Sequence, residues 1–293
     1  MIPYDSVEVP VEGGTLHVGR YGRGPQVLLA AHGITANHTE FHLLAETLGD
    51  DFTVVAPDLR GRGNSRNISG PFGMAAHADD VVAVLDQLGI DRAPLLGHSM
   101  GGFVAVVTAH RSPERITELI LVDGGLPLDL GPLNDLPADE LVQAVIGPAL
   151  ERLDMTFASP EAYFEFWRPH PALADDWNAY VEEHYAYDLV GRSPEMRSGV
   201  SKEAVITDGG DQLKNDDVRR AVANLTHRTV LVRAPRGLFN QEPPLYTDDA
   251  AAMWREQLPG LRDVLVPDVN HYTILLSERG AKAVADVVRE ATA

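Results

Sequence analysis

The chain has 293 residues, of which 44% are hydrophobic and 23% charged, so it is long enough to bury a large core as one domain or as a domain with an insertion. Its formal net charge of −19 disfavours nucleic acid and anionic membranes as partners, because both would repel it. The chain contains no cysteine, which excludes disulfides, thiolate catalysis and cysteine–metal sites.

The N-terminal stretch MIPYDSVEVPVEGG does not resemble a targeting segment. It has acids where a secretory signal carries basic residues, and it lacks an apolar core region. No apolar stretch reaches the roughly 20 residues that span a bilayer. We therefore expect a cytoplasmic protein that binds neither membranes nor nucleic acid. The sequence leaves the oligomeric state open, with a homo-oligomer among the alternatives.

Residues 1–125 alternate short apolar runs with amphipathic segments. Residues 6–22 predict a leading hairpin with a Gly-Gly turn. Apolar runs typical of buried strands follow at 26–33, 52–59, 93–99 and 116–125. Helical patterns lie between them at 41–50, 74–90 and 100–111. Strands that alternate with helices of this length predict right-handed crossovers and a parallel sheet.

This alternation stops after Gly125. Residues 126–225 are richer in proline and acids, and their patterns predict helices without intervening strands; Ser159 and Pro160 mark one helix start. Strand and helix patterns resume at 226–293. We therefore predict a core whose first part is 1–125 and whose second part is 226–293, interrupted by a helical cap at 126–225.

The stretch LLGHSMGG carries the strongest chemical signal. Gly97-His98-Ser99-Met100-Gly101 fits G-x-S-x-G between a predicted strand and a predicted helix, which is the context this motif requires. The turn leaves no room for side chains two residues either side of the serine, so glycines occupy those positions. The helix then directs its N-terminal N–H groups at negative charge that develops near Ser99. We predict that Ser99 is a nucleophile.

Four motifs occur in the order found in the α/β-hydrolase superfamily, which the chain resembles over nearly its whole length. They are HGITAN (32–37), DLRGRGNS (58–65), GHSMGG (97–102) and VNHYTI (269–274). The resemblance implies an α/β fold with a mostly parallel eight-stranded sheet flanked by helices and a helical cap inserted after strand six. It also implies that Asp58 and Arg60 brace a loop and take no part in catalysis.

The resemblance further assigns the remaining groups that a serine nucleophile needs. The backbone N–H groups of Ile34 and Met100 are the expected oxyanion hole, and Gly33 lets that loop approach a bound carbonyl. A serine hydroxyl also needs a base. Of eleven histidines, His271 follows the last predicted strand on a loop, where the superfamily carries its catalytic histidine.

Two carboxylates in the sequence are candidates for the third catalytic residue. Most of the superfamily carries the acid after strand seven, but the loop RAPRGLFNQEPP offers no aspartate; it has the neutral Asn240 and, further on, Glu242. Some lactonases and dehalogenases of the superfamily instead take the acid from the end of strand six, where Asp123 lies. We predict Asp123, with Glu242 as the alternative acid.

A Ser-His-Asp set with an oxyanion hole is suited to acyl transfer, so the sequence predicts a serine hydrolase that cleaves a carboxylic ester or a lactone. A serine nucleophile argues against dehalogenase and epoxide hydrolase chemistry, which use an aspartate at this position of the fold. The alternatives are a carbon–carbon bond hydrolase of the diketone type with the same residues, and a non-catalytic ligand-binding protein.

The predicted cap is expected to select the substrate. Its aromatic residues predict a mainly apolar pocket roof, with Trp167, Trp177 and Tyr180 as candidate lining residues. The expected partner is therefore a small-molecule substrate with an apolar portion. The acids of the cap lack metal-ligand spacing, and we expect no metal and no organic cofactor.

Overall fold

A computed structural model describes residues 2–293 of the chain. Within these residues, eight strands form one sheet in the order β1-β2-β4-β3-β5-β6-β9-β10. The strands are β1 Tyr4–Val11, β2 Gly14–Tyr21, β3 Gln26–Ala31, β4 Phe52–Pro57, β5 Ala93–His98, β6 Ile116–Val122, β9 Arg228–Arg233 and β10 Leu261–Leu265. Strands β1 and β2 are antiparallel to their neighbours, and all pairs from β4 to β10 are parallel. The predicted mostly parallel, eight-stranded sheet is confirmed.

Helices follow most of the parallel strands. They are α1 His42–Leu48, α2 Met74–Gln87, α3 Met100–Arg111, α4 Ala138–Arg152, α5 Pro160–Trp167, α6 Ala179–Asp188, α7 Lys202–Lys214, α8 Asp216–Ala223, α9 Asp248–Gln257, α10 Thr273–Leu276 and α11 Glu278–Ala291. A short 3₁₀ helix, η1 (His38–Phe41), precedes α1. Ser159 caps α5 and Pro160 begins it, as the sequence predicts.

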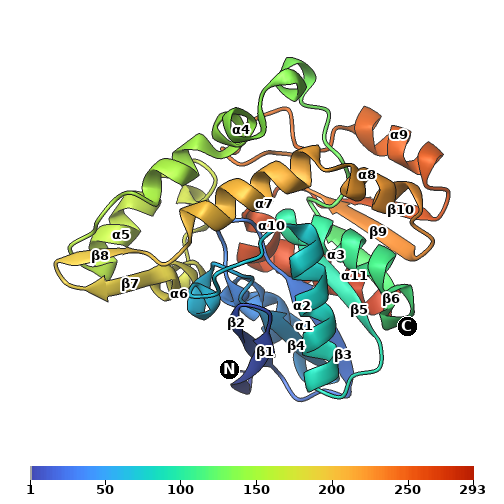
Figure 1. Cartoon of the computed structure of the whole chain (residues 1–293), viewed down its shortest axis with the longest axis horizontal. Coiled ribbons are helices and arrows are strands. Elements are labelled where there is room, and N and C mark those ends of the chain that lie inside the picture. The colour runs from blue at the N-terminus through green and yellow to red at the C-terminus, as the bar shows by residue number, and fades with distance from the viewer. Residues whose placement is uncertain (1) are drawn as a thin grey trace.

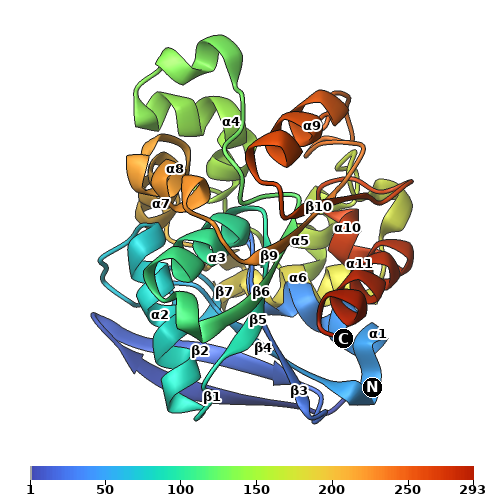
Figure 2. The same ribbon diagram turned by 90° about the vertical axis from the view of Figure 1, so that its right-hand side faces the viewer.

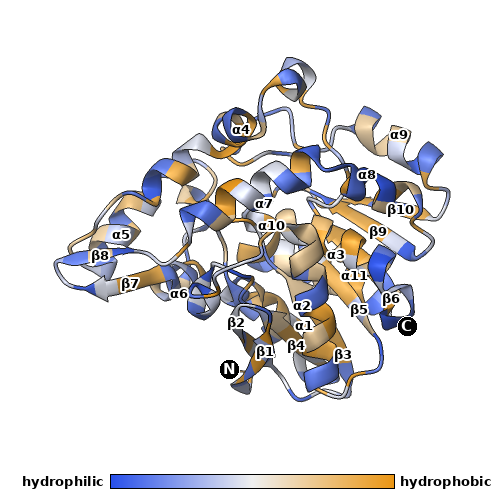
Figure 3. Ribbon diagram, viewed as in Figure 1, coloured by the Kyte–Doolittle hydropathy of each residue, from blue (hydrophilic) through white to orange (hydrophobic). Residues whose placement is uncertain are grey.

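The central strands β3, β4, β5, β6 and β9 bury both of their faces, which explains their continuous apolar runs. Leu95 and Leu119 belong to the core cluster that includes α2 and α3, whereas Leu96 and Ile120 belong to the cluster that includes α1 and α11. Successive side chains of a strand point to opposite faces, so each strand contributes to both clusters. Figure 2 shows α2 and α3 on one side of the sheet and α1 and α11 on the other. The central strands are mainly hydrophobic in Figure 3.

The segment between β6 and β9 extends to one side of the sheet and contains α4 to α8 (Figure 1). Its aromatic residues form a separate cluster that includes Tyr163, Trp167 and Tyr185. Helix α8 packs against α3 of the core, although it falls within the predicted cap range of 126–225. The boundaries of the cap therefore stay a prediction.

The expectation of helices without strands in this segment is wrong. Two strands, β7 (Leu189–Arg192) and β8 (Glu195–Ser198), form an antiparallel hairpin. Each has only four residues and most of them are partly or fully exposed, so neither shows the hydrophobic alternation by which a strand is recognised. Among residues 2–293, no helix combines the length and apolar character needed to cross a bilayer.

Candidate active site

Ser99 lies between the end of β5 and the start of α3, in a backbone conformation with φ of 53° and ψ of −120°. This left-handed region is unfavourable for a residue with a side chain. A Cβ at Gly97 would lie 2.1 Å from the carbonyl oxygen of Gly101, and one at Gly101 would lie 1.9 Å from that of Ala31. The close packing of these backbones therefore requires both glycines of the motif.

His271 and Asp123 meet although 148 residues separate them. Nδ1 of His271 donates to Oδ2 of Asp123 at 2.7 Å, and both side chains are buried. Because the carboxylate oxygen accepts, the proton of neutral His271 is on Nδ1, and the lone pair of Nε2 is free to accept another proton. This is the arrangement that a general base needs.

The backbone of β9 and of Ala234, which directly follows it, holds Asp123 in place. The N–H of Asp123 donates to the carbonyl of Val232 at 2.7 Å, and the N–H of Ala234 donates to Oδ1 of Asp123 at 3.2 Å. Asp123 has a positive φ of 45° as it leaves β6. The pairing of β6 with β9 thus fixes the position of this acid.

The alternative acid, Glu242, is an exposed residue of the loop after β9, and Asp123 already occupies Nδ1 of His271. Asn240, in the same loop, accepts a hydrogen bond from Nδ2 of Asn270 at 3.2 Å. That loop therefore supports the segment next to His271 through an amide. The structure brings Asp123, and not Glu242, to the histidine.

The loop after β3 orients the peptide between Gly33 and Ile34. The carbonyl oxygen of Gly33 accepts hydrogen bonds from Nδ1 of His32 at 2.8 Å and from the N–H of Ala36 at 3.1 Å. In a planar trans peptide the N–H points opposite to the carbonyl, so the N–H of Ile34 points away from these donors. Among the hydrogen bonds of residues 2–293, none uses this N–H.

His32 fixes this peptide as a neutral imidazole. Its Nε2 accepts the N–H of Leu59 at 2.9 Å, so its proton is on Nδ1, where it reaches Gly33. Burial lowers the pKa of His32 to about 4. Met100 is the first residue of α3, and its N–H belongs to the first turn, whose N–H groups have no intrahelical acceptor. The N–H groups of Ile34 and Met100, the two predicted oxyanion donors, are therefore available to bind a substrate oxygen.

A cavity of about 250 Å³ contains these groups. Its lining includes Gly33, Ile34, Ser99, Asp123 and His271 from the core. Apolar side chains form most of the remaining wall: Leu128, Val145, Ile146, Pro148, Ala149, Leu213, Leu238 and Leu245. Hydrophobic walls with a few convergent polar groups are typical of small-molecule sites.

Of the three aromatic residues predicted to line the pocket, Trp167 lines this cavity, whereas Trp177 and Tyr180 are not among its lining residues. Nε1 of Trp177 donates to Glu182 at 2.8 Å, and the ring of Tyr180 packs edge-on against His42 at 5.1 Å. Trp167 ends α5 and Trp177 lies before the start of α6, so the three aromatic residues do not share one helix face.

Several other lining residues were not predicted from the sequence. Among them are Glu40, Arg152 and Phe239. Arg152 is buried and donates to Asp188 at 2.7 Å. Burial by itself lowers the pKa of Arg152, but nearby Tyr163 and Asp188 raise it above its usual value. Its charge is thus already paired within the segment between β6 and β9.

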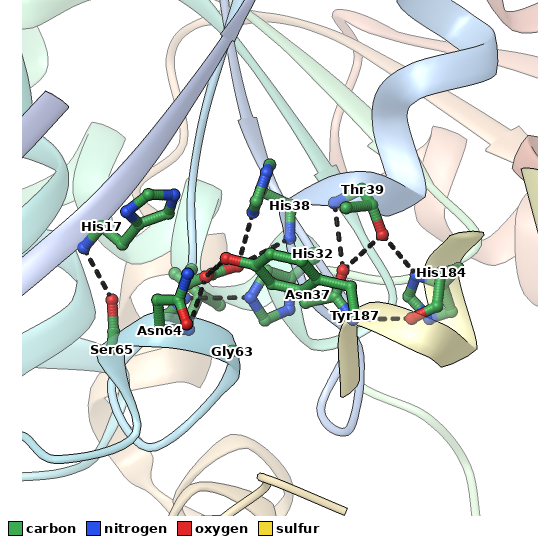
Figure 4. Close-up of polar contacts among 12 residues, drawn as sticks. His17, His32, Asn37, His38, Thr39, Gly63, Asn64, Ser65, His184 and Tyr187 are labelled. Atoms are coloured by element: carbon green, nitrogen blue, oxygen red, sulfur yellow. Dashed lines mark hydrogen bonds and ion pairs between the residues drawn. The ribbon is translucent and has the colours of Figure 1, made fainter. Parts of the chain in front are cut away.

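Asp58, His38 and His17 form the group of side chains closest to a metal-binding arrangement, with ligand atoms within 4.8 Å of one another. However, the two oxygens of Asp58 already accept four hydrogen bonds, from the N–H and Nδ1 of His38, the N–H of Asn64 and the hydroxyl of Tyr187. We interpret this cluster as a structural contact that holds α6 against the segment around η1. Figure 4 shows Tyr187 and His184 of α6 beside Asn37 and Thr39.

The sequence model of a family described as alpha/beta hydrolase fold matches residues 26–277. An uncharacterized protein of Mycobacterium tuberculosis is 40% identical over 104 residues, a match that covers 36% of this chain and only 30% of that relative. The 2-(acetamidomethylene)succinate hydrolase of Mesorhizobium japonicum is 28% identical over 258 residues, 88% of this chain and 85% of the relative. The crystal structure of an E-2-(acetamidomethylene)succinate hydrolase superposes with a TM-score of 0.79 at 23% identity, covering 98% of this chain and 100% of the other.

Proposed function

Because the chain belongs to the alpha/beta hydrolase family, we propose that it is a serine hydrolase that cleaves a carboxylic ester or a lactone through an acyl-enzyme. One observation carries the proposal: Nδ1 of His271 donates to buried Asp123 at 2.7 Å in the cavity that also contains Ser99. A serine, a base and an acid that orients the base form the set required for nucleophilic catalysis.

In the proposed reaction, Oγ of Ser99 attacks the carbonyl carbon and Nε2 of His271 takes the hydroxyl proton. The N–H groups of Ile34 and Met100 stabilise the oxyanion, and Asp123 stabilises the imidazolium. The tetrahedral intermediate then breaks its bond to the leaving oxygen, which receives the proton from His271. Water repeats these steps on the acyl-enzyme and releases the acid, so Ser99 and His271 return to their starting states.

The wall of the cavity supports a substrate with an apolar acyl or alcohol portion. Aliphatic side chains such as Val145 and Leu213 dominate it, and the Trp167 ring adds further apolar surface. Burying apolar substrate surface there contributes roughly 25 cal/mol per Å² before the costs of association. We therefore expect the cavity to select substrates by their size and polarity.

The diketone type of carbon–carbon hydrolysis remains the second candidate, since Arg152 and His170 are polar groups of the cavity wall that could hold an enolate. Arg152 is paired with Asp188, which favours the ester or lactone. The name of the Mesorhizobium relative describes an N-acyl substrate, so amides also belong among the compounds to be tested.

The test is a hydrolysis screen of p-nitrophenyl esters, lactones, N-acyl enamines and vinylogous 1,5-diketones with the wild-type chain and Ser99→Ala. We expect turnover of p-nitrophenyl butyrate, with a kcat at least about 10⁴-fold lower in Ser99→Ala and an unchanged circular dichroism spectrum. Turnover of esters that survives the substitution would disprove the role of Ser99. Hydrolysis of diketones alone would replace the ester proposal with the carbon–carbon alternative.

A further inference from the structure

Glu40 and His98 form a buried pair that the proposed reaction does not use. Glu40 lies in η1 and His98 is the last residue of β5, directly before Ser99. Nδ1 of His98 lies 2.9 Å from Oε1 of Glu40, and the two side chains are only 3% and 5% exposed. Both residues line the same cavity as Ser99.

The two remaining polar atoms of the pair contact the backbone on either side of the site. Nε2 of His98 donates to the carbonyl oxygen of His271 at 2.9 Å. Oε2 of Glu40 accepts the N–H of Gly33 at 3.3 Å. A continuous chain of hydrogen bonds thus runs from the oxyanion loop through Glu40 and His98 to the histidine loop.

The acceptors in this chain determine where its protons lie. The carbonyl of His271 only accepts, so Nε2 of His98 carries a proton. Burial by itself raises the pKa of Glu40, but His98 lowers it to about 2. Burial also lowers the pKa of His98, but Glu40 raises it above its usual value. Glu40 is therefore a carboxylate that accepts from both neighbours, and His98 is an imidazolium that donates to both.

The pair supplies an anchor for the backbone of His271. Asp123 orients the imidazole of His271, but His271 lies on a loop between β10 and α10, and its backbone also needs anchors. Its N–H donates to the carbonyl of Arg236 at 3.1 Å, and its carbonyl accepts from His98. A displacement of about 1 Å of a catalytic group can reduce a rate about 100-fold.

We propose that Glu40 and His98 are positioning residues that hold the backbone of His271 and the N–H of Gly33, one peptide before the Gly33–Ile34 peptide, at a fixed separation around Ser99. This inference rests on the proposed function, in which these two segments supply the base and one oxyanion donor. The pair touches no reacting atom in that scheme and acts only through His271 and Gly33.

Three substitutions of His98 separate its two hydrogen bonds. The amide nitrogen of glutamine corresponds to Nε2 of histidine, so His98→Gln keeps a donor for His271. The amide nitrogen of asparagine corresponds to Nδ1, so His98→Asn keeps a donor for Glu40 only. His98→Leu removes both donors.

The readouts are the kcat and KM of p-nitrophenyl butyrate hydrolysis and the rate at which an alkyl fluorophosphonate labels Ser99. In that labelling the Ser99 Oγ–phosphorus bond forms, the phosphorus–fluorine bond breaks, His271 accepts the proton and fluoride leaves. Mass spectrometry at the end of the reaction gives the fraction of protein that is folded and able to react. Each rate is then expressed per labelled molecule.

We expect His98→Leu and His98→Asn to lower kcat and the labelling rate about 10- to 100-fold, with KM changed less than about threefold. His98→Gln should stay within about fivefold of wild type. The matched control is Asp80→Asn, which disrupts the buried Arg60–Asp80 pair outside this cavity. It should lower stability and keep the labelling rate of the folded fraction within about twofold.

Equal rates for His98→Gln and His98→Asn, or a His98→Leu rate within twofold of wild type, would overturn the inference. If wild type labels at Ser99 but hydrolyses none of the screened compounds, the proposed function fails and the labelling rates still decide the role of the pair. If wild type does not label at Ser99, both proposals fail.

Discussion

The core side and the opposite side of the cavity are built in different ways. On the core side, hydrogen bonds hold the polar groups: the N–H of Ala234, directly after β9, donates to Asp123, and the neutral imidazole of His32 orients the Gly33–Ile34 peptide. On the other side, the segment between β6 and β9 contributes mainly apolar and aromatic side chains, and Phe166 is 39% exposed. In the proposed function, the sheet therefore positions the reacting groups, and the apolar wall from the segment between β6 and β9 selects the substrate.

The largest expected effect concerns the acid of the core side. Asp123→Asn should reduce kcat about 10⁴-fold, because an amide no longer stabilises the imidazolium and favours the wrong tautomer of His271. Glu242→Gln, the matched control on an exposed carboxylate, should stay within about twofold. Steady-state kinetics on p-nitrophenyl butyrate compare the two, and the reverse ranking would restore Glu242 as the acid.

The next largest effect concerns the hydrogen bond between Tyr187 of α6 and Asp58 of the core. Tyr187→Phe removes the hydroxyl that donates to Asp58 at 2.7 Å and should lower the free energy of unfolding by about 2 kcal/mol, as expected for a hydrogen bond to a charged acceptor. Tyr180→Phe, on the same helix, should change it by less than about 0.5 kcal/mol. Urea unfolding measures both. Equal values would mean that the Asp58 cluster does not brace α6.

Substrate selectivity should change when Trp167, which lines the cavity, is substituted, and should not change when Trp177 is substituted. Trp167→Ala enlarges the cavity and should raise KM for p-nitrophenyl butyrate about tenfold while shifting the preference towards longer acyl chains. Trp177→Ala lies outside the lining and should leave KM within about twofold. KM values for p-nitrophenyl esters of increasing acyl chain length, measured on both variants, test this prediction. Identical KM profiles would contradict the assignment of Trp167, and not Trp177, to the cavity wall.

The smallest expected effect is a pH dependence of stability in the core. Glu40 has a lowered pKa of about 2, so its stabilisation is present above its ordinary value of 4.5 and is lost as the pH falls from there. His98 has a raised pKa, so its stabilisation is present below its ordinary value of 6.5 and is lost as the pH rises through the folded-state value. The stability difference between wild type and Glu40→Gln should therefore be largest from about pH 4.5 to 6.5. Urea titrations across the pH range measure it, and a difference that grows above pH 8 would contradict the ion pair.

Local sequence was sufficient for some parts of the site and insufficient for others. The Ser99 turn was predictable because the spacing of its glycines and its place between a strand and a helix are local features of the sequence. The pair of Glu40 and His98 was not, because 58 residues separate two side chains that neither pattern nor spacing connects. The hairpin of β7 and β8 was missed because four-residue strands carry too little periodicity.

The sequence by itself determined the mostly parallel sheet, the turn that carries the proposed nucleophile Ser99 and the loop that carries His271, since these depend on apolar runs, glycine spacing and order along the chain. Only the tertiary structure decided which carboxylate faces that histidine. Asp123 reaches His271 because β6 pairs with β9, and a pairing of segments more than 100 residues apart is a property of the packed sheet. Tertiary contacts within the segment between β6 and β9 also place Trp167 in the cavity wall and Trp177 outside it, where its Nε1 donates to Glu182.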